Sequence, residues 1–140
     1  MASIFTRILN GGLPGHFVWK DAHCFAIMTI EPIREGHVIV IPNAEIDHWD
    51  DVPAATAAHL MHVSQQIAQA IKATVTCTRV GLMVVGLEVP HTHLHVMPID
   101  RTADMDFSHA RPARQDDLAA MAAKLRDALA AQGYPEAQLS

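Results

Sequence analysis

The sequence contains few cysteines, few aromatic residues and no long apolar run. Only two cysteines, Cys24 and Cys77, occur in 140 residues, and they form no CxxC motif. This usage argues against a disulfide framework and favours free, buried thiols in a reducing compartment. No apolar run approaches the ~20 residues of a membrane-spanning helix, and the N-terminal segment lacks the apolar stretch of a signal peptide. We therefore expect a cytoplasmic protein that does not enter a membrane.

Positive charge is also scarce. Ten Lys and Arg residues stand against 15 Asp and Glu residues, which gives a formal net charge of −5 with neutral histidines. Such a chain is a poor partner for polymeric nucleic acid, although a local group of donors can still hold the phosphate of one nucleotide. Apolar residues make up 50% of the chain, enough for one core, so we expect a single domain over residues 1–140.

Strand-like segments predict a sheet. Residues 24–30 (CFAIMTI) and 36–42 (GHVIVIP) are apolar and rich in β-branched residues, and EPIREG between them carries the proline and glycine of a turn. These two runs predict a buried hairpin. Residues 16–21 and 80–86 predict further strands by composition.

Helical patterns alternate with the strands. A short amphipathic turn over residues 3–9 ends at Asn10-Gly11-Gly12, and residues 116–133 predict a C-terminal helix that stops at a glycine. A long alanine-rich helix is predicted over residues 53–72, where apolar residues recur at helical spacing, namely Leu60, Val63, Ile67 and Ile71. This element order favours an α+β fold with a largely antiparallel sheet.

The segment PHTHLHVMP, residues 90–98, places a histidine at every second position. If it is a strand, His91, His93 and His95 share one face, while Leu94 and Val96 face the core. Three hypotheses fit such a row of imidazoles. The first is a structural role without chemistry, and the second is a metal site with three neutral imidazole ligands.

The third hypothesis is phosphorus chemistry. A neutral imidazole is a nucleophile near pH 7 and can form a covalent phosphohistidine, which divides one difficult displacement into two easier ones. Neighbouring imidazoles can donate hydrogen bonds to the phosphoryl oxygens or to the leaving group. One strand could then supply both the nucleophile and its electrostatic support.

Several stretches together resemble the histidine triad (HIT) superfamily. HTHLHVM is similar to the family's His-x-His-x-His signature, with Thr92 at a usually apolar position. SIFTRILNGGLP resembles the family's opening segment, CFAIMTIEPIREGHVIVIP its central hairpin, and GLEVPHTHLHVMP its approach to the triad. DFSHARP and the following alanine-rich helix resemble bacterial members. The resemblance implies a HIT-like, five-stranded antiparallel sheet with a long central helix and a C-terminal helix, and a homodimer.

The resemblance also implies an activity. Family members hydrolyse or transfer nucleoside monophosphates from phosphoramidates, adenylylated amines or dinucleoside polyphosphates through a nucleotidyl-histidine. By motif position, His93 is the nucleophile, His95 hydrogen-bonds the phosphate or bridging atom, His91 buttresses the site, and His37 meets it from the neighbouring strand. No cofactor is required for the covalent step, although Mg²⁺ can accompany a polyphosphate substrate. The positions that match the apolar base pocket are Phe5, Ile8, Leu13, Ile27 and Ile30.

This sequence departs from the family pattern at the substrate-binding positions. Thr29 stands where a ribose-binding acidic residue is common, and its hydroxyl is neither charged nor bidentate. Leu87 and Glu88 replace a Gln-Ser or Gln-Thr pair that assists the leaving group; Glu88 could act as a general acid if it were buried. No asparagine occurs between Gly81 and His91, where the family carries one.

Some family branches bind zinc through N-terminal cysteines. Ser3 and Thr6 occupy that region here, so we expect no metal site. We therefore predict a HIT-type nucleotide hydrolase with a small-molecule substrate. The departures favour one alternative, a nucleotide-binding regulatory module with little turnover; a metal-dependent enzyme is a weaker alternative.

Overall fold

The computed structural model of the protein describes residues 2–137 and contains one five-stranded antiparallel sheet with strand order β1-β2-β3-β5-β4. The strands are β1 (Phe17–Lys20), β2 (Cys24–Met28), β3 (Val38–Pro42), β4 (Arg79–Val84) and β5 (Leu94–Ile99). The α-helices of this part of the chain are α1 (Ile4–Leu9), α2 (Ala54–Thr74) and α3 (Gln115–Ala131). The predicted α+β class and the antiparallel sheet are confirmed.

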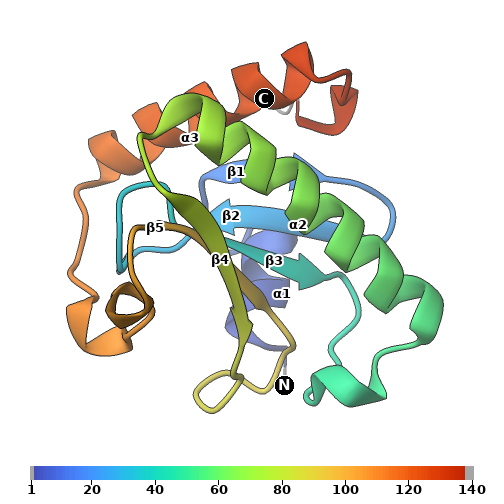
Figure 1. Cartoon of the computed structure of the whole chain (residues 1–140). Helices are drawn as coiled ribbons and strands as arrows, with labels where there is room; N and C mark the ends of the chain where they lie inside the picture. Colours follow the sequence, from blue (N-terminus) through green and yellow to red (C-terminus); the bar gives the residue numbers. More distant parts are fainter. Residues whose placement is uncertain (1, 138–140) are drawn as a thin grey trace.

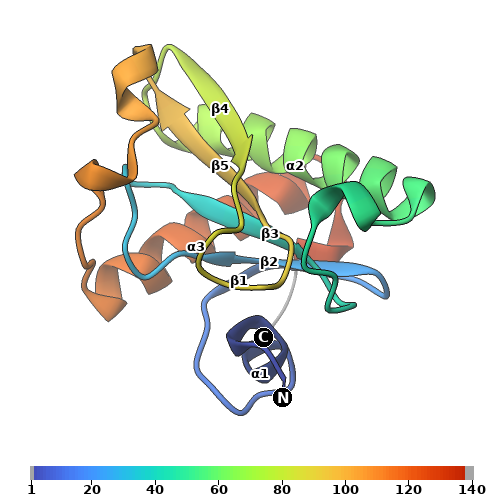
Figure 2. The same ribbon diagram turned by 90° about the horizontal axis from the view of Figure 1, so that it is seen from below.

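The two faces of the sheet are covered by different helices. In Figure 1, α2 crosses in front of the sheet and α3 lies along the top, whereas Figure 2 shows α1 set apart from both on the other side. Along β3, Val38 and Val40 belong to the core formed with α2 and α3, and Ile39 and Ile41 pack with Phe5 of α1. This alternation is the period-two pattern of a strand buried on both faces.

The predicted hairpin and the long helix are confirmed. β2 pairs with β3 from Cys24 opposite Pro42 to Met28 opposite Val38, which is the turn-linked arrangement expected for the two apolar runs. All four residues of the predicted apolar stripe on α2 are buried against the sheet and α3, namely Leu60, Val63, Ile67 and Ile71. At ~25 cal/mol per Å² of apolar surface, each such side chain contributes roughly 1.5–3 kcal/mol when fully buried.

The histidine segment differs from the prediction, because β5 begins only at Leu94. His91 and His93 therefore precede the strand. Thr92 explains this: its amide nitrogen and its hydroxyl both donate to the Ile46 carbonyl, each at 2.7 Å. These bonds tie the segment to the loop after β3 instead of to a strand ladder. Leu94 and Val96 do face the helices, as predicted.

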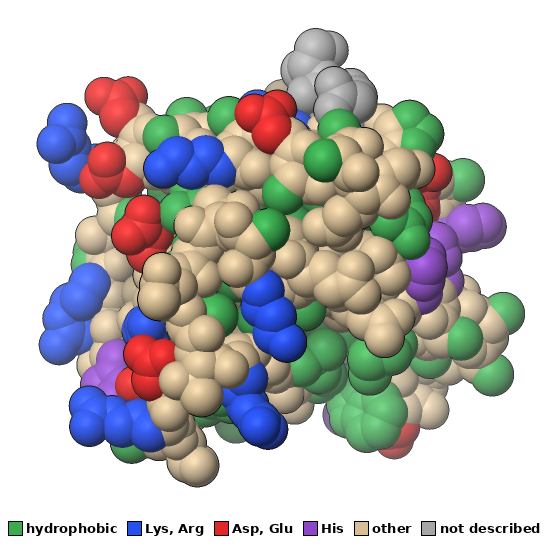
Figure 3. All heavy atoms as spheres, turned by 45° about the horizontal axis from the view of Figure 1, so that its top comes forward, with side chains coloured by type: hydrophobic (Ala, Val, Ile, Leu, Met, Phe, Trp, Pro, Cys, Tyr) green, Lys and Arg blue, Asp and Glu red, His purple; other side chains and the backbone are tan. Residues whose placement is uncertain are grey.

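The surface of this domain does not carry a continuous basic area on the face that α3 crosses. Figure 3 shows Lys and Arg side chains on the left of that face interspersed with Asp and Glu side chains. On this face, basic side chains are therefore mixed with acidic ones and do not form one continuous stripe. No helix within residues 2–137 combines the length and apolarity needed to cross a bilayer.

Candidate active site

The two central strands bring three histidines to the side of the sheet that faces α1. β3 and β5 are paired with Ile39 opposite His95, and His37 lies two residues before Ile39 on the same face. The ring centroids of His93 and His95 are 4.9 Å apart, and those of His37 and His95 are 5.2 Å apart. The predicted meeting of His37 with the triad across the sheet is therefore what the structure shows.

Hydrogen bonds determine which nitrogen carries the proton in His37 and His95. The Ile33 amide donates to His37 Nδ1 at 3.1 Å, so the proton of the neutral His37 ring sits on Nε2. His37 Nε2 in turn donates to His95 Nδ1 at 3.0 Å. His95 must then hold its own proton on Nε2. The Ile33 amide thus fixes the tautomer of His37, and His37 fixes that of His95. As a result His95 keeps an Nε2–H group that can donate to a ligand.

His93 has the opposite arrangement. Its Nδ1 lies 2.8 Å from the His91 carbonyl, and a carbonyl only accepts, so Nδ1 carries the proton. Nε2 of His93 consequently keeps its lone pair. His93 is 7% exposed and His95 is 8% exposed, so both rings are largely shielded while still reaching a cavity. The pair presents a nucleophilic nitrogen beside an N–H donor.

His91 lies beneath the cavity and does not line it, which corrects the prediction that all three triad rings face the same space. Its Nε2 donates to the Pro42 carbonyl at 2.8 Å, and its Nδ1 accepts from the Ser3 hydroxyl at 2.6 Å. Both ring nitrogens are therefore occupied. The backbone carbonyl of His91 contacts His93 Nδ1 at 2.8 Å and so orients the His93 ring, while the buttressing role stays a prediction.

The network around His91 includes Ser3 and Thr6, the N-terminal residues considered above as replacements for zinc-binding cysteines. Ser3 caps α1 by accepting from the Thr6 amide at 3.1 Å, and its own amide donates to Glu45. Hydrogen bonds from the Thr6 hydroxyl and the Ser3 amide lower the pKa of Glu45. Side-chain oxygens of Ser3 and Glu45 thus link α1 to His91 and to the loop after β3.

Burial keeps the three cavity-side rings neutral. Desolvation, followed by the charge of His93, lowers the pKa of His37 to about 4. Desolvation, followed by the charges of His37 and His93, lowers the pKa of His95 to about 3. Desolvation also lowers the pKa of His93, partly offset by its bond to the His91 carbonyl and by Glu88. All three imidazoles are therefore neutral at pH 7, each with one protonated ring nitrogen.

The cavity beside these rings has a volume of about 440 Å³, within the range of small-molecule sites. Its walls are mostly apolar and come from α1, the end of β2, the loop 85–89 and the segment after β5. The predicted residues that line it are Phe5, Thr29, Ile30, Glu88, His37, His93 and His95. Glu88 is exposed, so the condition of burial under which it would act as a general acid is not met.

The family of this chain follows from its similarity to known proteins. A family model described as the HIT domain matches residues 10–102, about two thirds of the chain. This chain belongs to the HIT family. An uncharacterized HIT-like protein of Mycobacterium tuberculosis is 29% identical to this HIT protein over 138 residues, covering 94% of the chain and 96% of the relative.

Two further comparisons extend this result. The crystal structure of a zinc-bound histidine triad family protein from Mycobacterium smegmatis superimposes on this HIT domain with a TM-score of 0.80 at 27% identity, covering 95% and 96% of the two chains. The adenosine 5'-monophosphoramidase HNT1 of Saccharomyces cerevisiae is 26% identical over 98 residues, covering 69% of this chain and 62% of HNT1. The HIT family therefore includes hydrolases as well as proteins without an assigned activity.

Three predicted pocket residues of this HIT protein do not line the cavity: Ile8, Leu13 and Ile27. Ile27 is 3% exposed in the cluster formed with Phe5, and Ile8 packs against that cluster. Leu13 is half-buried in the loop after α1. Ile8 and Ile27 thus support the wall that Phe5 presents.

Sequence reasoning missed other parts of the HIT cavity. Phe107, from a 3₁₀ helix after β5 (Phe107–His109), places its ring 4.9 Å from that of His95. Glu31 and Ile39 also line the cavity. Ile39 could have been predicted to line the cavity, because it lies two residues after His37 and so shares its face of the strand. No sequence pattern predicted the place of Phe107 in the cavity wall, because that place depends on the path of the chain after β5.

Proposed function

We propose that this HIT protein hydrolyses, or transfers the nucleotidyl group of, a nucleoside monophosphate amide or ester. The observation that carries the proposal is the fixed orientation of His93, which holds an unprotonated Nε2 at the cavity while Nδ1 is bonded to the His91 carbonyl. This geometry suits in-line attack on phosphorus. The likeness to HNT1, whose name denotes an adenosine monophosphoramidase, supports the same chemistry.

In the proposed first step, His93 Nε2 forms a bond to phosphorus as the bond from phosphorus to the leaving group breaks. The leaving amine departs with a proton from solvent. The nucleotidyl-imidazolium retains its Nδ1 proton, which the His91 carbonyl accepts. His95 donates its Nε2 proton in a hydrogen bond to a phosphoryl oxygen or the bridging atom and so stabilises the developing charge. Water then attacks phosphorus as the bond from phosphorus to Nε2 breaks; it loses one proton to solvent, and the nucleoside monophosphate and neutral His93 are released. None of these steps uses a cofactor.

The charge of the cavity favours an amine as leaving group over a polyphosphate. Glu31 and Glu88 are the carboxylates among its lining residues, and no Lys or Arg lines it within residues 2–137. A polyphosphate would bring several negative charges beside two carboxylates, whereas a protonated amine would be attracted by them. Among the substrate classes considered from the sequence, a nucleoside phosphoramidate or adenylylated amine therefore fits best. A polyphosphate substrate would need Mg²⁺ to offset this repulsion.

The nucleotide base fits the apolar part of the cavity. Phe5 and Ile39 form a buried wall beside the triad, and the exposed Ile30 extends it toward solvent. Thr29, half-buried next to Ile30, offers one hydroxyl to the ribose. We propose weaker ribose recognition than an acidic residue would give, because a hydroxyl makes a single uncharged hydrogen bond.

Mass spectrometry after rapid mixing with adenosine phosphoramidate tests this function. The wild-type protein should gain the mass of one adenylyl group on His93, and free AMP should accumulate. His93→Ala should lose both signals, while His62→Ala, at an exposed position on α2, should keep them. Saturable AMP binding without adduct or product would instead support the regulatory module, which the exposed, non-donating Leu87 at a donor position favours.

We also propose that the protein forms a homodimer through β4 and α2. β4 is an edge strand, and the apolar side chains of Trp49, Met61 and Leu82 are 58%, 54% and 38% exposed. They surround a groove of about 440 Å³ beside this edge. An exposed strand edge next to apolar side chains is the arrangement that a second copy covers.

A further inference from the structure

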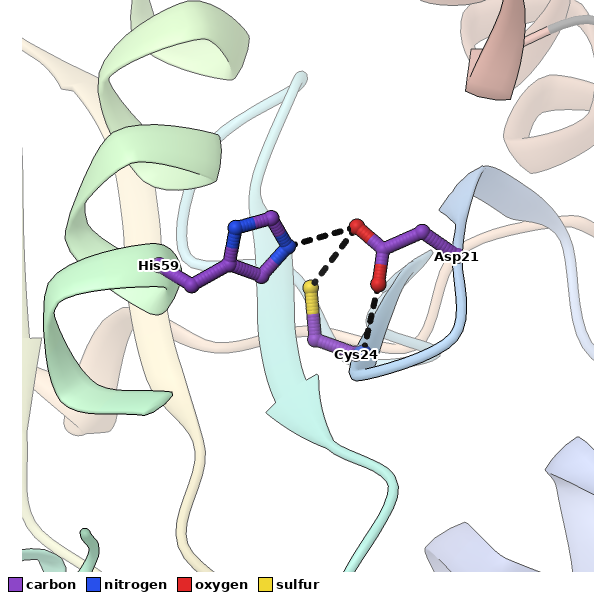
Figure 4. Close-up of side chains that lie close together, drawn as sticks. All are labelled: Asp21, Cys24 and His59. Atoms are coloured by element: carbon purple, nitrogen blue, oxygen red, sulfur yellow. Dashed lines mark hydrogen bonds and ion pairs between the residues drawn. The ribbon is translucent and has the colours of Figure 1, made fainter. Parts of the chain in front are cut away.

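A second group of polar side chains lies at the opposite end of β2 from the cavity. Asp21 belongs to the turn between β1 and β2, Cys24 is the first residue of β2, and His59 comes from α2. Figure 4 shows the three side chains converging from these elements, with the Asp21 carboxylate in contact with both His59 and Cys24. Thr29, which lines the cavity, follows the other end of the same strand. The two sites are therefore separate.

The ligand atoms of these residues are close enough to share one ion. His59 Nε2 lies 2.6 Å and Cys24 Sγ 3.7 Å from Asp21 Oδ2, and the three atoms all lie within 4.8 Å of one another. Zinc bonds of about 2.0–2.3 Å in a tetrahedral site separate neighbouring ligand atoms by roughly 3.3–3.8 Å. The sulfur and the carboxylate already have this separation. His59 Nε2 has to withdraw from Asp21 Oδ2 by less than about 1 Å to reach the same separation.

Asp21 is held in place as an ionised ligand. Its Oδ2 accepts from Trp19 Nε1 at 2.7 Å, and its Oδ1 accepts from the His23 and Cys24 amides at 2.7 and 2.8 Å. Burial alone would raise the pKa of Asp21, but these bonds and that from His59 outweigh it and lower the pKa to about 2. A carboxylate fixed by neighbouring donors is typical of the support that metal ligands receive.

Cys24 is the member of the group whose surroundings suit a cation. The residue is fully buried, and burial together with the neighbouring Asp21 charge raises the pKa of its thiol. Without a cation, the sulfur is a weak donor toward a carboxylate at 3.7 Å. A divalent ion would stabilise the thiolate and the carboxylate together.

We propose that Asp21, Cys24 and His59 bind a zinc-type divalent transition metal. Thiolate, imidazole and carboxylate together match the ligand preference of Zn²⁺ and exclude that of Mg²⁺ or Ca²⁺. Water, or the ring of His23 whose centroid lies 5.6 Å from that of His59, completes the coordination. Binding releases the Cys24 thiol proton to solvent and moves the His59 proton from Nε2 to Nδ1, so one proton leaves per ion. The ion would cross-link the β1–β2 turn to α2.

This site differs from the metal hypothesis considered for the triad. The ring nitrogens of His91 are both bonded elsewhere, and Nδ1 of His93 is bonded to a carbonyl. The sequence predicted no metal site, because Ser3 and Thr6 stand at the positions of the family's zinc-binding cysteines. Asp21 and His59 are 38 residues apart, and no motif connects them. The three residues of this site take no part in the proposed catalytic function, so the two proposals are independent.

Cobalt substitution tests the proposal in the full-length protein. Metal-free protein titrated with Co²⁺ should develop a sulfur-to-cobalt charge-transfer band in the near ultraviolet, saturating at one ion per chain, and Zn²⁺ should displace it. Cys24→Ala should abolish the band. Cys77→Ser, at the other free cysteine, and His93→Ala, in the triad, should both retain it.

A second variant keeps the test valid if Cys24→Ala does not fold. His59→Gln removes a half-exposed ligand on α2 and should weaken Zn²⁺ binding by at least about 10-fold in equilibrium dialysis, with unchanged circular dichroism, because even loss of a residue that only supports a ligand costs about 10- to 100-fold. His62→Ala is its matched control one turn along the helix. The proposal is overturned by the absence of a charge-transfer band in the wild-type protein, by its loss in Cys77→Ser, or by unchanged Zn²⁺ affinity in His59→Gln.

Discussion

His37 Nε2 donates a 3.0 Å hydrogen bond to His95 Nδ1, and this single contact determines where His95 carries its proton. His37 itself is oriented by the Ile33 amide. His37, which directly precedes β3, thus determines the tautomer of His95 in the neighbouring strand β5.

Removal of the His37 ring should impair catalysis more than binding. His37→Leu leaves His95 Nδ1 without its donor, so the ring is free to adopt the tautomer that lacks an Nε2 proton. We expect kcat to fall by about 10²-fold, comparable with the loss of one oxyanion donor, while KM changes little. Steady-state hydrolysis of adenosine phosphoramidate measures both constants. A large rise in KM at unchanged kcat would contradict this role.

Stability should decrease as the pH falls below the ordinary histidine pKa of 6.5. Burial lowers the pKa of His37 to about 4 and of His95 to about 3, so below pH 6.5 the unfolded chain binds protons that the folded chain does not. Each ring should then cost about 1.4 kcal/mol of unfolding free energy per pH unit, down to its folded pKa. Urea unfolding between pH 7 and pH 5 measures this slope. His95→Gln should reduce it, whereas His48→Gln, at an exposed position, should not.

The carboxylates at the cavity should determine the choice of leaving group. Replacing Glu88 with Lys reverses one charge beside the triad without altering a buried contact, because Glu88 is exposed. We expect kcat/KM for a dinucleoside polyphosphate to rise by about tenfold relative to that for a phosphoramidate, and the gain to shrink at high salt. Glu35→Lys, on the exposed turn before β3, is the charge-matched control. An equal change in both variants would show that net charge, not the cavity, is responsible.

Ser3 should affect both α1 and the triad. Ser3→Ala removes the N-cap of α1 and the hydroxyl that donates to His91 Nδ1. Loss of an N-cap costs about 1 kcal/mol, and the unpaired buried nitrogen adds roughly 1–3 kcal/mol. Ser3→Thr keeps the hydroxyl and should retain most of the stability. Denaturant unfolding of the two variants separates the hydroxyl from the size of the side chain.

The edge of the sheet should govern assembly. Leu82→Glu places a charge in the apolar groove between β4 and α2. We expect a dimeric wild-type protein and a monomeric variant by light scattering after size-exclusion chromatography, since a buried unpaired charge costs several kcal/mol. Leu87→Glu, at a side chain that is 90% exposed in the loop after β4, should leave the dimer intact. A monomeric wild-type protein would remove the basis for this surface.

The positions of the main strands and of the long helix were predictable from the sequence, because they depend on the local spacing of apolar residues. The apolar runs that form β2 and β3 are rich in strand-forming residues, and the apolar residues of α2 recur at helical spacing. The residues of both strands and of this helical stripe are buried, as predicted. The orientation of His91 was not predictable, because it depends on Thr92 bonding the Ile46 carbonyl 46 residues away. Phe107 and the group formed by Asp21, Cys24 and His59 likewise depend on contacts between distant segments, which no spacing in the sequence encodes.

The hydroxyl of Ser3 reaches His91 across 88 positions of the chain, and the same short helix supplies Phe5 to the cavity wall. Proteolytic removal of the residues up to and including Thr6, or a fusion that displaces them, should therefore reduce turnover even though the sheet and both long helices stay folded. Assays of activity are best made on protein whose N-terminal segment is intact.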